Sequence, residues 1–280
     1  MLDRFLRYAI WCAVIWFIFI ATTNYFNLRL LWNDEECVFK SVKAFSTFEM
    51  FNRPLLSAQV FPRGYLYLIQ KFSSQYDFSL LSLRLPSFIC MMLGLFFWMR
   101  LVSFELTSRL EYFTYALSWT ASSLLLYYAS ELKPYSMDVM VAGVYLLFIY
   151  STFHRLKGDS KWPCPIFMLM LYVLPFFCFF SYPSLLFALI VLYNLIVATA
   201  RFKVRPHYLI IFSCSLVTAL ILSYTYDMQY RNLDTVTKGF GDYFISYVSI
   251  GEFFRTLGEG LNNLFSRFLD RKSTRLNSSH

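Results

Sequence analysis

The chain has 280 residues, of which 58% are hydrophobic and only 15% are charged, and its mean hydropathy is +0.50. This composition excludes an ordinary water-soluble domain and is typical of a protein with several membrane-spanning segments. The net charge of +8 does not indicate nucleic-acid binding, because the basic residues form short clusters between apolar stretches and not one continuous face.

Seven stretches are apolar and long enough to cross the roughly 30 Å hydrocarbon core of a bilayer. In chain order they are 8–26, 85–104, 112–129, 137–153, 165–180, 182–200 and 208–226. The first is rich in Trp and Phe and lacks a small-residue cleavage site, so we expect a retained helix and not a signal peptide. The fifth and sixth should form a hairpin that turns at Ser181–Ser184, because basic clusters lie at both ends of the pair.

Basic residues precede the first stretch and fill the second, fourth and sixth connections. The positive-inside rule then makes the N-terminus and these connections cytoplasmic. Residues 29–80, the turn at Glu131–Ser136 and the segment after Asp227 should consequently lie on the external side.

Apolar residues recur at helical spacing in the first and last external segments, at 38–48 and at 253–268. This pattern predicts two amphipathic helices that lie on the membrane surface. Residues 271–280 contain almost nothing apolar, and we expect them to be a non-native or disordered tail.

An acidic pair, Asp34 and Glu35, follows the first apolar stretch almost directly. A carboxylate beside the membrane surface can take a proton from a hydroxyl group, and a nearby Arg or Lys can bind a phosphate. A structural interpretation is equally open from the residues alone. Asn33 or Asp34 would then cap the first external helix, with Glu35 in its first turn, where it complements the helix dipole.

The six cysteines show no CxxC spacing and lie mostly in apolar runs, where a thiol packs as a small hydrophobic group. The sequence therefore indicates neither a disulfide framework nor a zinc site. It also contains no phosphate-binding glycine loop and no nucleophile elbow.

Four motifs, taken in order, resemble those of the GT-C glycosyltransferases, and within them the protein mannosyltransferases and aminoarabinose transferases. They are Asp34-Glu35, Phe61-Pro62-Arg63-Gly64-Tyr65, Arg84-Leu85-Pro86-Ser87 and the run YYASELKPY from Tyr127 to Tyr135. The resemblance covers roughly residues 5–265. It implies an all-α integral membrane protein with about seven transmembrane helices that transfers a sugar from a polyprenyl-phosphate donor to an external glycan, lipid or protein acceptor.

The resemblance also implies roles for individual residues. Asp34 would be the catalytic base, and Glu35 would bind the acceptor or a divalent cation; no other cofactor is indicated. Some relatives carry Lys where Phe61 stands here, so the donor phosphate must be held by other side chains. The candidates for that role are Arg63, Arg84, Lys133 and Tyr135.

Ordinary interpretations remain open for three of these side chains. Arg84 could be an interfacial anchor, Lys133 could pair with Glu131, and Tyr135 could be one more aromatic residue at the membrane interface. The rival function is a transporter or flippase for a lipid-linked substrate. It is disfavoured because the apolar stretches contain almost no ionisable residue and the two halves show no internal repeat.

Enzymes of this family are typically longer than this chain. We therefore expect residues 1–270 to be the N-terminal membrane module of an enzyme of cell-envelope glycosylation in the bacterial cytoplasmic membrane, inactive by itself.

Overall fold

The computed structural model describes residues 2–27, 29–56, 59–106, 108–156, 164–202 and 206–227. Within these residues the secondary structure is helical and contains no strand. The predicted amphipathic helix at 253–268 and the predicted tail at 271–280 lie outside the described residues.

Among the described residues, five helices are long and apolar enough to cross a membrane. They are α1 (Leu2–Phe26), α5 (Leu80–Glu105), α8 (Tyr135–Leu156), α10 (Ser184–Phe202) and α11 (His207–Tyr226). The chain is therefore an all-α protein of the integral membrane class. The number of seven crossings stays a prediction, because the other two apolar stretches form shorter pieces.

The stretch 112–129 divides into α6 (Arg109–Thr120) and α7 (Ser123–Tyr128), and 165–180 divides into α9 (Cys164–Val173) and the 3-10 helix η2 (Leu174–Phe179). Ser122 accepts a hydrogen bond from the backbone N–H of Leu125 and so begins a new helix after α6 ends. Pro175 lies in the first turn of η2 and has no N–H to continue the α-helical ladder.

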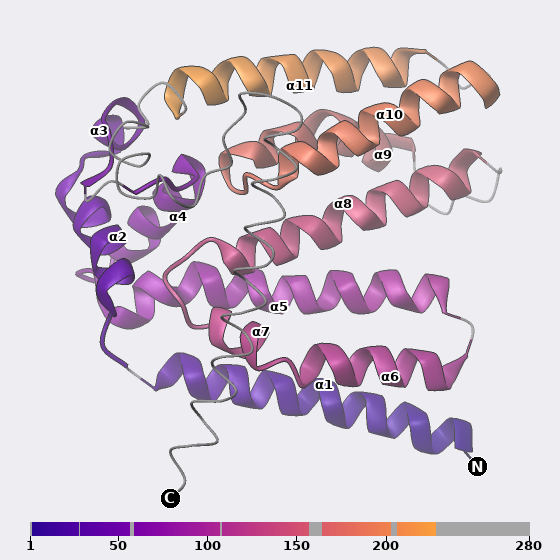
Figure 1. The fold of residues 1–280 in the computed structure, drawn as a ribbon, viewed down its shortest axis with the longest axis horizontal. Coiled ribbons are helices and arrows are strands. Elements are labelled where there is room, and N and C mark those ends of the chain that lie inside the picture. The colour runs from indigo at the N-terminus through magenta and orange to yellow at the C-terminus, as the bar shows by residue number, and fades with distance from the viewer. Residues whose placement is uncertain are drawn as a thin grey trace, which may run out of the picture. The chain divides into compact units, whose positions relative to one another are not determined.

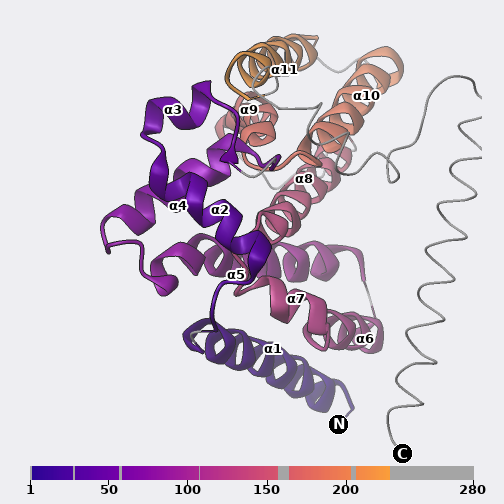
Figure 2. The ribbon, with the colours of Figure 1, turned by 60° about the vertical axis from the view of Figure 1, so that its left-hand side comes forward.

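The long helices run side by side, with α5 between α1 and α8, as Figures 1 and 2 both show. Helices α5 and α8 approach closely where Gly143 faces α5, because a Cβ atom at that position would lie 3.0 Å from Cβ of Phe97. The predicted hairpin turn is confirmed: the N–H of Ser184 donates to the carbonyl of Ser181 at 3.2 Å, and α10 begins at Ser184.

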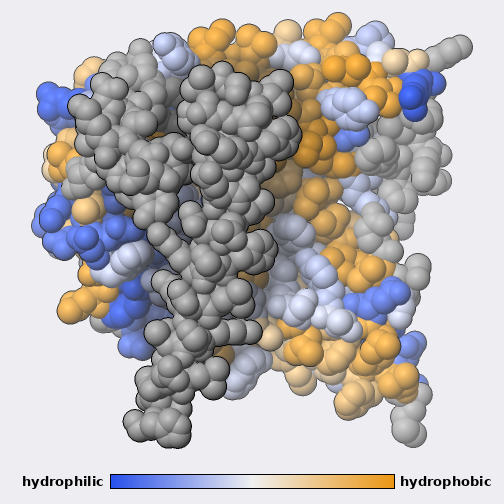
Figure 3. Space-filling model, viewed as in Figure 1, coloured by the Kyte–Doolittle hydropathy of each residue, from blue (hydrophilic) through white to orange (hydrophobic). Residues whose placement is uncertain are grey.

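Helices α2 (Asn33–Ala44), α3 (Thr47–Asn52) and α4 (Arg63–Ser74) gather at one end of the long helices, on the left of Figure 1. Hydrophilic surface gathers at the same end in Figure 3. The start of α1, the α5–α6 connection and the end of α8 lie at the opposite end. The polar segments predicted for one side of the membrane and the basic segments predicted for the other are thus separated along the helix axes.

The first predicted amphipathic helix is only partly right. Its apolar stripe is divided, since α2 ends at Ala44 and α3 begins at Thr47. Val38 and Val42 are at most 1% exposed and belong to the protein core, with α4 packed against α2. The prediction that Val38 and Val42 face the membrane surface is therefore wrong, because α4 covers them, whereas Phe48 in the same stripe is 76% exposed.

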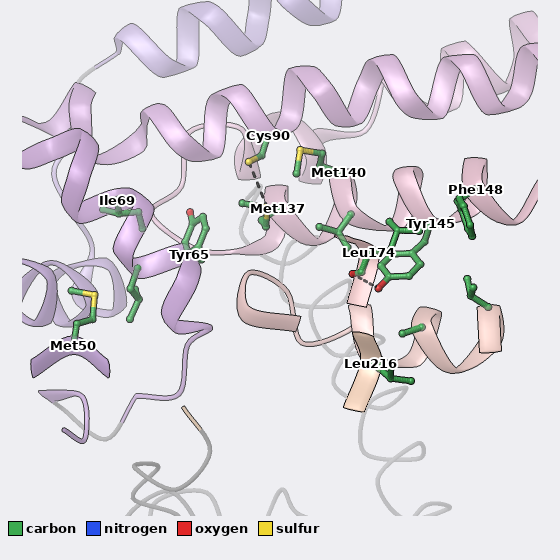
Figure 4. Packing of buried hydrophobic residues seen from close by; sticks show 14 of the residues in the cluster. Met50, Tyr65, Ile69, Cys90, Met137, Met140, Tyr145, Phe148, Leu174 and Leu216 are labelled. Carbon is green, nitrogen blue, oxygen red and sulfur yellow. Dashed lines mark hydrogen bonds between the residues drawn. The ribbon is translucent and has the colours of Figure 1, made fainter. Parts of the chain in front are cut away.

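The core near this end joins α4, α5, α8 and η2 (Figure 4). Tyr145 donates a hydrogen bond to the carbonyl of Leu174 at 2.6 Å, which ties α8 to η2. Gly64, in the first turn of α4, allows η2 to approach, because a Cβ atom there would lie 2.7 Å from the carbonyl oxygen of Phe179. The contact at Gly64 fixes the first turn of α4 against η2.

Candidate functional site

Asp34 and Lys133 are 99 residues apart in the sequence, yet they form an ion pair in which Lys133 Nζ donates to Asp34 Oδ2 at 3.0 Å. Asp34 lies in the first turn of α2, and Lys133 lies in the short connection between α7 and α8. The Asp34 side chain is 51% exposed, whereas that of Lys133 is 9% exposed. An accessible carboxylate is therefore held beside a largely buried cation.

Lys133 has further neighbours that favour its charged form. Its Nζ lies 4.3 Å from the centre of the Trp32 ring, 5.6 Å from that of Tyr135 and 3.6 Å from Oε1 of Glu131. Burial lowers the pKa of Lys133, but the hydrogen bond to Asp34 and the charges of its neighbours outweigh burial and leave that pKa raised. Burial raises the pKa of Glu131, and Lys133 opposes this effect. The amine of Lys133 therefore stays charged at neutral pH.

Glu35 is fully buried and bound from four directions. Arg29 Nη2 lies 3.2 Å from Oε1, and Arg84 Nη2 lies 3.2 Å from Oε2. The backbone N–H of Leu132 donates to Oε1 at 2.7 Å, and that of Trp32 donates to Oε2 at 3.3 Å. Glu35 thus joins the α1–α2 connection, α5 and the α7–α8 connection at one point.

Asp34 does not cap α2, and neither does Asn33. The N-cap residue is Trp32, and the cap interaction is made by Glu35, which accepts from the Trp32 N–H. Asp34 stands at the second helical position, and its carboxylate bonds to Lys133 instead of to the helix. The capping interpretation is wrong because α2 begins at Asn33, earlier than that interpretation requires.

Arg84 is not an interfacial anchor, because its side chain is 1% exposed. Its Nη1 donates to the carbonyl of Arg29 at 2.9 Å, and its Nη2 bonds to Glu35. Arg84 and Glu35 are thus bound to each other inside the protein, and neither side chain is exposed to a donor phosphate, an acceptor or a divalent cation, contrary to the prediction. No group of three or more His, Cys, Asp or Glu side chains that could hold a metal occurs among the described residues.

Arg63 belongs to a different buried cluster. Its Nη1 donates to the carbonyl of Met50 at 2.8 Å, and its Nε lies 3.5 Å from Oδ1 of Asp227, directly after α11. The hydroxyl of Tyr182 donates to Oδ2 of the same Asp227 at 2.9 Å. The Arg63 side chain is 2% exposed, so the structure does not bring this predicted phosphate ligand to Asp34 and Lys133.

Three tyrosines flank the Lys133 connection. The Tyr65 hydroxyl donates to the Lys133 carbonyl at 2.7 Å and shares a 2.6 Å hydrogen bond with Oγ of Ser87, and burial raises the Tyr65 pKa. On the other side, the rings of Tyr128 and Tyr135 are 4.6 Å apart. Tyr135 is 37% exposed, so this predicted residue does lie at the cluster with an accessible edge.

A pocket of about 330 Å³ opens beside this network, between the end of α1 and α7. Its wall is formed by Asn24, Asn27, Arg29, Ser123, Leu126, Tyr127 and Ser130. The Arg29 side chain is 31% exposed, and its guanidinium lies 4.9 Å from the centre of the Tyr127 ring. Arg29 therefore supplies positive charge both to the buried Glu35 and to an open pocket.

Comparison with protein-family models, with curated proteins and with solved structures gives no match to this chain. The interpretation of the site rests on the geometry described above and on the sequence motifs.

Sequence reasoning missed Arg29 and Trp32 as members of this site. The signal for Arg29 was not selective: it is a basic residue on the predicted external side, but residues 29–80 contain five other basic residues, Lys40, Lys43, Arg53, Arg63 and Lys71. Trp32 gave no comparable signal, because aromatic residues are common at membrane interfaces.

Proposed function

We propose that the chain is the membrane module of a glycosyltransferase that moves a sugar from a polyprenyl-phosphate donor to the hydroxyl of an external acceptor. One observation carries the proposal. The half-exposed Asp34 carboxylate lies 3.0 Å from the amine of Lys133 at the polar end of apolar, membrane-length helices. The pocket that contains Arg29 lies beside the Glu35 network next to this pair.

The proposed reaction needs a base and cations, and the site offers both. Asp34 takes the proton of the acceptor hydroxyl as that oxygen forms a bond to the anomeric carbon. The bond from this carbon to the phosphate oxygen breaks, and the lipid phosphate leaves with the electron pair. Lys133 and Arg29 stabilise the additional negative charge on the phosphate, and direct displacement inverts the anomeric centre.

The ion pair between Asp34 and Lys133 implies that the donor binds before Asp34 acts as a base. Without a donor, Lys133 holds the Asp34 carboxylate in an ion pair at 3.0 Å. A donor phosphate competes for the same amine, so its arrival releases Asp34 from the pair. The carboxylate is then free to contact the acceptor hydroxyl only when a donor is present.

We assign Glu35 and Arg84 a positioning role in this function. Glu35 follows Asp34 in the chain, and its Oε1 accepts from the N–H of Leu132, which precedes Lys133. The buried contact between Glu35 and Leu132 thus fixes Asp34 and Lys133 next to each other. Arg84 and Arg29 balance the charge of Glu35, which would be costly to bury alone.

Topology provides one test of the proposed orientation, in which the Asp34 end is external. In a cysteine-free background, a cysteine at Tyr76, which is 61% exposed in the α4–α5 connection, should react with a membrane-impermeant thiol reagent in intact cells. A cysteine at Arg201, in the last turn of α10, should react only after the cells are made permeable. The opposite labelling pattern would invert the orientation and place the site in the cytoplasm.

Donor binding provides the test of the function. Lys133→Gln should weaken binding of a polyprenyl phosphate by roughly tenfold to a hundredfold, the scale of a lost hydrogen bond to a charged group. Binding is measured on the purified chain with the sugar-free lipid phosphate, so the sugar need not be known.

Lys40→Gln is the matched control, because Lys40 lies on α2 with a 56% exposed side chain paired to Glu36. Unchanged affinity in Lys133→Gln, or an equal loss in both variants, would remove Lys133 from the donor site.

A further inference from the structure

A second cavity lies at the end of the helices opposite Asp34. It is a groove of about 640 Å³ between α1, α5 and α6. Three arginines contribute to it, namely Arg7 near the start of α1, Arg100 near the end of α5 and Arg109 at the start of α6. The remaining wall is mainly apolar and includes Trp11, Val14, Ile18, Met92 and Phe96. The groove is therefore cationic at one end and hydrophobic along the rest of its length.

The length of the groove corresponds to one leaflet of a bilayer. Its wall runs from Arg7 to Ile18 on α1 and from Met92 to Ser103 on α5. At 1.5 Å per residue each of these segments is about 16 Å long. The hydrocarbon of one leaflet is half of a core of roughly 30 Å. With the arginines at the membrane interface, Ile18 and Met92 lie near the bilayer centre.

The three arginines have no acidic partner among the described residues, because none of the ion pairs found there includes Arg7, Arg100 or Arg109. All three are exposed, and no described residue of the groove wall is acidic. The guanidinium of Arg100 lies 4.3 Å from the centre of the Phe104 ring, which leaves its N–H donors available. The three arginines thus concentrate positive charge at the mouth of the groove, and this charge favours binding of an anionic ligand.

We infer that this groove binds an anionic phospholipid, with the phosphate among Arg7, Arg100 and Arg109 and an acyl chain along α1 and α5. Positive charge at the interface selects the headgroup, and the leaflet-length apolar wall accepts the chain. The inference does not depend on the proposed transferase function, because it uses no residue of the Asp34 site. If the Asp34 end is external, as proposed above, the lipid in this groove belongs to the inner leaflet.

Tryptophan fluorescence tests this site with an internal control. Trp11 lines the groove, whereas Trp16 does not, and both side chains belong to α1 and are 61% exposed. Two variants of the chain, each retaining one of these tryptophans and carrying Phe at the other tryptophan positions, are placed in bilayers that contain a minority of lipid with brominated chains. Trp11 should be quenched several-fold more strongly by brominated phosphatidylglycerol than by brominated phosphatidylcholine, while Trp16 should respond equally to both.

Arginine variants then distinguish a specific lipid site from a nonspecific effect of surface charge. Arg7→Gln should reduce the preference of Trp11 for phosphatidylglycerol by about fivefold, which corresponds to about 1 kcal/mol for one basic residue near anionic lipid. Arg4→Gln, one turn earlier on α1 and outside the groove, should leave the preference unchanged. Equal effects of the two variants, or no headgroup preference at Trp11, would overturn the inference. Protection of Trp11 from both lipids would also overturn it, because another part of the chain or a second copy would then fill the groove.

A second measurement avoids tryptophan replacement. The unmodified chain, extracted in mild detergent and analysed by native mass spectrometry, should retain anionic phospholipid. The triple variant Arg7→Gln, Arg100→Gln, Arg109→Gln should lose it. Retention of the same lipid by the triple variant would contradict the site.

Discussion

Asp34→Asn should reduce sugar transfer by roughly a hundredfold or more, the scale expected for loss of a general base. Folding should be preserved, because Asp34 is half exposed and does not cap α2. The Asn side-chain oxygen can still accept the hydrogen bond from Lys133, so the local arrangement remains while the proton acceptor is lost. The measurement is transfer from a polyprenyl-phosphate donor by the full-length protein in membranes, at equal protein amounts.

The matched control for this variant is Glu36→Gln. Glu36 lies two residues further along α2, its side chain is 51% exposed, and it pairs with Lys40 at 3.1 Å. An Asp34 that served only the helix dipole would contribute about 0.3–1 kcal/mol to stability and nothing to the rate. Near-normal transfer by Asp34→Asn would remove the catalytic assignment, and an equal loss in Glu36→Gln would attribute the effect to surface charge.

The individual residues of the site were easier to predict than their contacts. Asp34, Glu35, Arg84 and Lys133 all stand in motifs that were visible in the sequence, and the structure brings them together. Their pairing was hidden, because Glu35 meets the Leu132 backbone 97 residues away and no spacing rule reaches that far. The sequence consequently offered Arg84 as a donor-phosphate ligand or as an interfacial anchor, whereas the structure makes it a buried partner of Glu35.

Helical periodicity showed the same limit. The apolar stripe through Val38 and Val42 correctly indicated a helix with one apolar face. Periodicity does not say what covers that face, and the structure supplies α4, on which Tyr65, Leu66 and Ile69 are fully buried. Length and hydropathy predicted seven membrane-length stretches, and five of them form membrane-length helices among the described residues. The interruptions of the other two at Ser122 and Pro175 depend on local caps and backbone donors that a hydropathy average ignores.

Removing one member of the buried pair should have the largest effect on stability. Glu35→Gln leaves Arg84 charged at 1% exposure without its carboxylate, and Arg84→Leu leaves Glu35 buried without one of its two arginines. Breaking a buried ion pair in this way typically costs about 3–5 kcal/mol. We expect a lower unfolding temperature in detergent and a reduced yield of folded protein for each single variant.

The double variant Glu35→Leu, Arg84→Leu separates stability from positioning. Replacing both charges by apolar groups is often neutral, so the double variant should recover much of the stability that either single variant loses. Transfer should not recover, because Leu at position 35 cannot accept from the Leu132 N–H, and the connection that carries Lys133 then loses its backbone hydrogen bond to α2. Recovery of transfer together with stability would show that the pair serves folding alone and that Asp34 and Lys133 find each other without it.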